Sequence, residues 1–168
     1  MTIVAAIDGT PSSETVVQTA HDVSSAFDEE LIVLHVMEQE EYERIAERAK
    51  GPTSGTPSYP FTPSDSSVTL STGGQSAEGY PIDTAAEDAT TVARSFAEEA
   101  LPADAAFSAD GRVGEPTKKI LESVERNDAH MLVIGGRKRS PVGKALFGSI
   151  TQSVLLNSER PVLTCMHE

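Results

Sequence analysis

Short runs of apolar residues alternate with segments of helical periodicity along most of the chain. Two of these runs, residues 2–8 and 31–37, are too brief for a buried helix and give way to polar positions, as buried strands do. Thr10 and Pro11 follow the first run and suit the N-cap and the first position of a helix. Strand, helix and strand in this order predict a βαβ unit with parallel strands. The apolar stripe of its helix consists of Val16, Val17, Ala20, Val23 and Phe27.

The same alternation returns in the second half of the chain. Thr84 and Glu87 form a capping-box pattern that predicts a helix through Ala100, and Glu115-Pro116 predicts the start of another. We therefore predict a single α/β domain over residues 1–168. It would contain an open, doubly wound, five-stranded parallel sheet with helices on both faces and the last strand at its edge. The other expected elements are strands at 105–109, 131–134 and 161–166 and a helix at 148–156.

Residues 38–80 interrupt this alternation. Residues 38–50 are rich in charge and could form a solvated helix, whereas residues 51–80 consist mostly of Ser, Thr, Pro and Gly. A composition of that kind buries too little apolar surface to offset the entropy of ordering the chain. We interpret residues 51–80 as a flexible insertion into the domain that is either disordered or functional.

The charge balance limits the classes of partner. Thirteen basic and 26 acidic residues give a net charge of −13, and such a surface repels nucleic acids and anionic membranes. Lysine is scarce and tryptophan is absent, a composition typical of a halophilic cytoplasm, where salt screens the self-repulsion. An ordinary acidic mesophilic protein is the alternative. We expect a cytoplasmic protein, because no apolar run approaches a membrane span and no secretory signal is visible.

A locally basic segment follows the fourth predicted strand. Residues 137–144 contain four basic side chains, and no acidic residue occurs from Met131 to Asn157. In an open α/β sheet, ligands bind beyond the carboxyl ends of the strands, and glycines and a helix N-terminus suit a phosphate there. The segment therefore suggests a phosphate site; the alternative is that these side chains are solvated and pair with surface carboxylates. Neither the P-loop pattern nor the dinucleotide fingerprint Gly-x-Gly-x-x-Gly is present.

The spacing within this segment resembles that of the universal stress proteins. Their pattern is Gly-x-x-Gly, a nine-residue spacer and then Gly followed by Ser or Thr. Gly135 and Gly148-Ser149 match it, with Lys138 in place of the second glycine. The opening Val-Ala-Ala-Ile-Asp-Gly-Thr, the Leu-His-Val of the second strand and the Arg-Pro-Val-Leu near the end are similar to the same family. The resemblance covers residues 1–37 and about 84–168.

The resemblance implies an adenine-nucleotide-binding regulatory protein of the stress response. Its ligand would be ATP, with or without Mg²⁺, and it would form a homodimer through the last strand, residues 161–166. Asp8 and the backbone of Val36, with Ala6 beside them, would face adenine and ribose. Lys138 could supply a positive charge to the phosphates, although its stem obstructs a close backbone approach. The phosphates would be lined by Gly135, Gly148, Ser149, Ile150 and Thr151.

Other interpretations of the sequence remain open. The same fold could serve as a stress or interaction protein with an empty nucleotide site, because Lys138 replaces a motif glycine and the insertion could recruit a partner. We expect at most slow ATP hydrolysis, because the sequence shows no pattern of catalytic residues. His35 in a buried strand favours a structural role over that of a ligand. Cys165, the single cysteine, favours a packed side chain over a reactive one.

Overall fold

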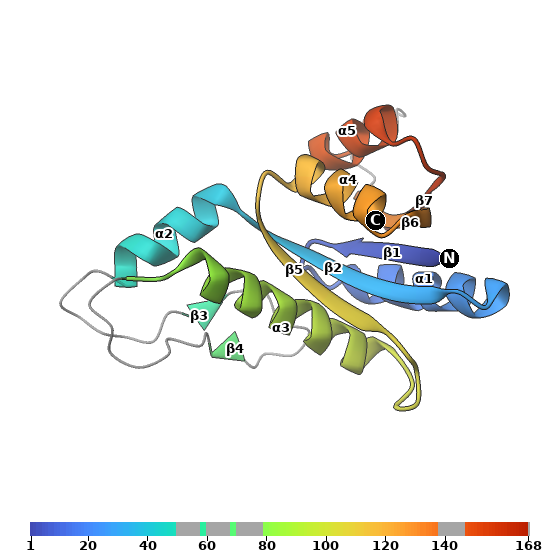
Figure 1. The fold of residues 1–168 in the computed structure, drawn as a ribbon, viewed down its shortest axis with the longest axis horizontal. Coiled ribbons are helices and arrows are strands. Elements are labelled where there is room, and N and C mark those ends of the chain that lie inside the picture. Colours follow the sequence, from blue (N-terminus) through green and yellow to red (C-terminus); the bar gives the residue numbers. More distant parts are fainter. Residues whose placement is uncertain (50–57, 60–67, 70–78, 138–146, 168) are drawn as a thin grey trace.

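The computed structural model describes residues 1–49, 58–59, 68–69, 79–137 and 147–167 (Figure 1). The strands of its main sheet are β1 (Thr2–Ile7), β2 (Glu30–Glu38), β5 (Ser108–Gly114), β6 (Ala129–Arg137) and β7 (Val162–His167). They follow the order β5-β2-β1-β6-β7, and every neighbouring pair is parallel. The predicted five-stranded parallel sheet is confirmed, and β7 lies at an edge as expected.

Helices cover both faces of this sheet (Figure 1). They are α1 (Ser13–Phe27), α2 (Gln39–Ala49), α3 (Ile82–Ala100), α4 (Pro116–Arg126) and α5 (Ser149–Asn157). Ile3 and Ala5 of β1 enter the core formed with α1 and α3, whereas Val4 and Ala6 enter the core formed with α4 and α5. Because successive residues of β1 face two different cores, the whole strand is apolar. Within the described residues, no helix combines the length and the apolar character needed to cross a membrane.

The strand order reverses at β1. The chain runs outward from β1 to β2 on one side, and β6 and β7 lie on the other side. The helices that follow β1 and β6 therefore pack on opposite faces, and a crevice opens between the carboxyl ends of these two strands.

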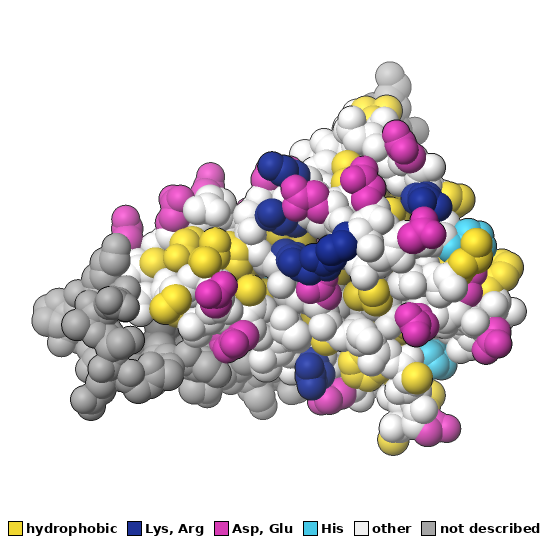
Figure 2. Space-filling model, viewed as in Figure 1, with side chains coloured by type: hydrophobic (Ala, Val, Ile, Leu, Met, Phe, Trp, Pro, Cys, Tyr) yellow, Lys and Arg dark blue, Asp and Glu magenta, His cyan; other side chains and the backbone are white. Residues whose placement is uncertain are grey.

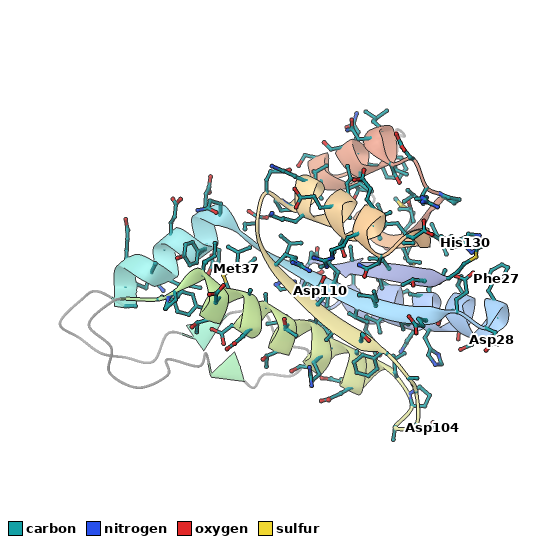
Figure 3. All side chains as sticks on the ribbon, viewed as in Figure 1. Phe27, Asp28, Met37, Asp104, Asp110 and His130 are labelled. Carbon is teal, nitrogen blue, oxygen red and sulfur yellow. The ribbon has the colours of Figure 1, made fainter. Side chains whose placement is uncertain are left out.

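α1 begins later than the sequence suggests, and the last residue of its predicted apolar stripe is exposed. Thr10 and Pro11 lie in a turn, and the helix starts at Ser13. The prediction of Thr10 as the N-cap is wrong, because its hydroxyl donates to Asp8 Oδ1 (2.6 Å) instead. Phe27, the last residue of the predicted buried stripe, is 57% exposed and meets the ring of His130 edge-on, with centroids 5.8 Å apart (Figure 3).

Two further boundaries differ from the predictions. α3 begins at Ile82, so Thr84 and Glu87 lie inside the helix and form no capping box. The extended Pro81 precedes the helix, and its carbonyl accepts the N–H of Ala85. β5 starts at Ser108, three residues later than the predicted start at 105, and extends to Gly114. Pairing with β2, rather than the short apolar run, sets its position.

Of the predicted insertion at 51–80, the structure describes two short strands and the last two residues. β3 (Ser58–Tyr59) and β4 (Val68–Thr69) pair in antiparallel fashion. The remainder lies outside the described residues, so its flexibility stays a prediction. Tyr80 is 4% exposed and its hydroxyl donates to the buried carboxylate of Asp88. The last residue of the predicted insertion therefore contributes to the core.

Candidate functional site

A pocket of about 590 Å³ opens at the carboxyl ends of β1, β2 and β6, where the strand order reverses. The segment leading into α1 and the first turns of α2, α4 and α5 complete its wall. Lys138, one of the nine residues singled out from the sequence, lies outside the described residues. The other eight all line the pocket: Ala6, Asp8, Val36, Gly135, Gly148, Ser149, Ile150 and Thr151.

Asp8 follows β1 directly and is held by the turn into α1. Its Oδ1 accepts hydrogen bonds from the N–H of Thr10 (3.0 Å), from the Thr10 hydroxyl (2.6 Å) and from the Ser13 hydroxyl (3.1 Å). An aspartate that bonds to the backbone two residues on forms a compact turn, which fixes the carboxylate at the strand end. An ionised carboxylate only accepts hydrogen bonds, so Asp8 can pair with hydroxyl or amino groups of a ligand.

His35 lies opposite the end of β1 and forms part of the pocket wall. The ring is 2% exposed, and its Nδ1 lies 3.1 Å from the carbonyl oxygen of Ile7. Burial lowers the pKa of His35 from 6.5 to about 4, against the opposing effects of the Ile7 carbonyl and of Asp8. The ring is therefore neutral at pH 7, and Nδ1–H donates to the carbonyl. This hydrogen bond joins β1 to β2 at the pocket, in agreement with the structural role that the sequence favours.

The N-terminus of α5 faces the pocket without a side-chain cap among the described residues. Gly148 is the N-cap, and its carbonyl accepts the N–H of Gln152. The earlier N–H groups of the turn carry the positive end of the helix dipole. At the start of α4, by contrast, the Glu115 carboxylate accepts from the N–H of Thr117 (3.0 Å) and of Lys118 (2.7 Å). Of these two helix starts, that of α5 suits an anion.

Thr151 fixes the start of α5 to the sheet. Its side chain is largely buried, and its hydroxyl donates to the carbonyl oxygen of Gly135 (2.9 Å). The hydrogen bond connects the first turn of α5 to the end of β6. The hydroxyl of Thr151 therefore positions the start of the helix at the pocket.

Our sequence-based prediction missed the wall that comes from the end of β2 and from α2. Glu38, Glu41 and Arg44 line the pocket there. The strand-end argument that singles out Val36 could have found Glu38, two residues further along the same strand. The residues of α2 gave no such signal, because their charge predicts a solvated helix. The wall formed by α4 and the residue before the N-cap of α5 is apolar and includes Pro116, Ile120 and Phe147.

An open parallel α/β sheet with a pocket at the reversal of strand order defines a protein of the doubly wound α/β class. The family model described as "Universal stress protein family" matches residues 1–58 and 54–165, and the chain belongs to this family. The resemblance seen in the sequence is thereby confirmed.

Two relatives show the extent of the similarity. A universal stress protein of Mycolicibacterium smegmatis is 47% identical over 49 residues, which are 29% of this chain and 38% of that protein. The stress response protein NhaX of Bacillus subtilis is 27% identical over 171 aligned residues, which cover 96% of this chain and 95% of that protein.

Solved structures share the fold. A universal stress protein in complex with cAMP superposes with a TM-score of 0.55 at 20% identity, covering 100% of this chain and 98% of that one. The universal stress protein of Archaeoglobus fulgidus in complex with dAMP gives a TM-score of 0.50 at 18% identity, with 98% and 96% covered. At such identities the likeness establishes the architecture alone.

Proposed function

We propose that this chain is an adenine-nucleotide-binding regulatory protein of the stress response and that its ligand is ATP. The observation that carries the proposal is the pocket, which has two chemically different ends. The start of α5 offers backbone N–H groups to an anion, and the region of Asp8 and Val36 offers an acceptor and an apolar wall to a nucleoside. The complexes of two structural neighbours with cAMP and with dAMP support an adenine nucleotide.

In the proposed complex, Asp8 accepts hydrogen bonds from ribose hydroxyls, and the base lies against Ala6 and Val36. The phosphates lie at Gly135 and at residues 148–151, with Lys138 adding a positive charge. Among the described residues, no three His, Cys, Asp or Glu side chains gather into a metal site. We propose that any Mg²⁺ is held chiefly by the phosphates, as this ion commonly is in nucleotide sites.

A nucleotide regulates a protein only if it binds two states of that protein with different affinity. α5 begins at the pocket and leads into the edge strand β7. An edge strand presents unpaired backbone groups that can pair with a second copy. We propose a homodimer through residues 161–166, in which nucleotide binding at α5 changes the stability of the interface.

Binding of ATP is tested by equilibrium dialysis with labelled ATP at high salt. We expect saturable binding with a dissociation constant below roughly 1 mM, which corresponds to a binding free energy more favourable than about −4 kcal/mol. Asp8→Ala should weaken it about tenfold or more, because hydrogen bonds to a charged group contribute about 1.5–3 kcal/mol. Asp22→Ala is the matched control, since it removes the same charge from an exposed position of α1. Absence of saturable binding would contradict the proposal.

A second candidate function is an interaction protein of the same fold with an empty site. It is favoured by Lys138, which stands where the family pattern has glycine. The variant Lys138→Gly separates the two functions. A gain of ATP affinity supports the empty site in the native chain, whereas a loss supports a lysine that contacts phosphate.

A further inference from the structure

We propose that Glu41 determines which nucleobase the pocket accepts and that it selects a base edge carrying an amino group over one carrying a carbonyl oxygen. The inference rests on the proposed nucleotide-binding function and names a specificity residue for it. It starts from the position of α2. This helix follows β2 without a connecting loop, so its first turn continues the pocket wall beyond Val36.

α2 is held in place from two sides, and the position of Glu41 is therefore defined. Ile45 is 3% exposed and belongs to the core beside α1 and α3. The hydroxyl of Tyr42 donates to the carbonyl oxygen of Tyr80 (3.1 Å), and their rings lie 6.0 Å apart. The charge-rich sequence suggests a solvated helix, whereas in the structure α2 is anchored to the core and to Tyr80.

The carboxylate of Glu41 is itself ordered. Its side chain is only 17% exposed and forms an ion pair with Arg44 one turn later, which also lines the pocket. A carboxylate that is partly withdrawn from water and fixed by a guanidinium is a directional acceptor of hydrogen bonds. Glu38 adds a second carboxylate to the same wall, so this end of the pocket carries more negative than positive charge.

The two ends of the pocket therefore require opposite properties of a ligand. The anionic end of a nucleotide is favoured at the start of α5 and is repelled by Glu38 and Glu41. With the phosphates at α5 and the nucleoside along Val36, the far edge of the base reaches the wall of Glu41. An exocyclic amino group donates to a carboxylate there. A carbonyl oxygen at the same place brings two acceptors together with no hydrogen between them, which disfavours it.

ATP and inosine triphosphate provide the comparison, because they carry the same ribose and triphosphate and differ only along one edge of the base. On that edge ATP has an amino group beside an unprotonated ring nitrogen, whereas inosine triphosphate has a carbonyl oxygen beside a ring N–H. We expect the native protein to bind ATP about 10–100-fold more tightly than inosine triphosphate, measured by isothermal titration calorimetry. In Glu41→Gln the ratio should fall to within about threefold, because an amide can both accept and donate. Glu47→Gln removes the same charge from an exposed position on α2 and should keep the native ratio.

The outcomes separate this inference from the function on which it rests. If the native protein binds neither nucleotide, the proposed function fails and the inference fails with it. If the native protein binds ATP but Glu41→Gln retains the native ratio of the two affinities, ATP binding stands and the role of Glu41 is wrong. Thermal unfolding of each variant confirms that the fold is intact in either case.

Discussion

Gly111 in β5 determines how closely α3 approaches the sheet. A Cβ atom at this position would lie 2.1 Å from the backbone nitrogen of Thr90 and 2.3 Å from the carbonyl oxygen of Ala86. Both atoms belong to the backbone of α3 and cannot rotate away. The absence of a side chain at Gly111 is therefore what allows the backbone of the helix to touch the strand.

The variant Gly111→Ala should be strongly destabilised, because α3 must shift away from β5. We expect the free energy of unfolding to fall by about 3 kcal/mol, at the upper end of the usual cost of overpacking. Denaturant-induced unfolding measures this change. Gly148→Ala is the control, since a Cβ there meets no atom of the described residues within 4 Å. Equal stability of the two variants would show that α3 is not packed as described.

His35 makes the stability of the protein dependent on pH. Burial lowers the pKa of His35 to about 4 in the folded state, whereas the unfolded chain titrates near 6.5. Between these values the unfolded state binds more protons, so the free energy of unfolding decreases as the pH falls from 6.5 towards 4. The difference between the two pKa values contributes about 3 kcal/mol to the free energy of unfolding, and this contribution is fully present above pH 6.5.

Unfolding curves between pH 4 and pH 8 test this assignment. In His35→Gln the amide can donate to the carbonyl of Ile7 but does not titrate. The variant should be less stable at pH 7 and should lose less stability on acidification than the native protein. Parallel pH profiles of the two proteins would show that another group is responsible.

At the scale of the element, the two helix starts at the pocket differ in their capping. Glu115 caps α4 with its own carboxylate, and the hydrogen bond from the backbone N–H of Lys118 is the main reason that the pKa of Glu115 is lowered. The sequence Glu115-Pro116 gave the correct start of this helix. The N-cap of α5 is instead Gly148, which has no side chain to cap the N–H groups of the first turn.

We expect Glu115→Ala to reduce the free energy of unfolding by about 1 kcal/mol, the usual contribution of an N-cap. Thermal unfolding at neutral pH measures the loss. Glu125→Ala at the other end of α4 serves as the control and should be neutral or slightly stabilising, because a carboxylate there opposes the helix dipole. A neutral effect of Glu115→Ala would mean that water replaces the cap without cost.

At the scale of the whole molecule, charge is distributed unevenly. Lys and Arg side chains gather where α4 lies beside β5 (Figure 2), and many of them are paired. Arg112 and Arg126 both donate to Asp110, and Lys119 pairs with Glu122. The whole chain nevertheless has an excess of 13 negative charges. Self-repulsion of this size destabilises the compact state, and salt screens it.

We therefore expect the melting temperature to rise between 0.1 and 2 M KCl, as the halophilic interpretation of the composition requires. A variant with Asp22→Asn, Glu87→Gln and Glu98→Gln removes three exposed charges. It should melt about 2–5 °C higher than the native protein at low salt and at the same temperature at high salt. A melting temperature that does not change with salt would favour the ordinary mesophilic alternative.

The proposed homodimer depends on the edge of the sheet that is formed by β7. Leu163, the second residue of the edge strand β7, is 36% exposed. A lysine in an edge strand opposes pairing with a second edge, so Leu163→Lys should convert a dimer into a monomer. Light scattering at micromolar concentration and high salt measures the mass. Phe27→Lys replaces an exposed apolar residue of α1 and should remain dimeric; a native monomer would contradict the interface.

The sequence by itself determined the fold class, because buried parallel strands and amphipathic helices have different periodicities that can be read locally. The runs at 2–8 and 31–37, the Glu115-Pro116 start and the glycines around residue 135 gave the sheet and the place of the pocket. These signals depend on neighbours within a few residues. The position of Asp8 at a strand end can likewise be inferred from its neighbours in the sequence.

Only the tertiary structure decided the features that depend on contacts between distant segments. Pairing with β2 set the bounds of β5, Asp88 of α3 gave Tyr80 a buried partner, and the anchoring of α2 brought Glu41 and Arg44 to the pocket. No local pattern encodes such contacts, because their free energy arises from surfaces that meet only after the chain has folded.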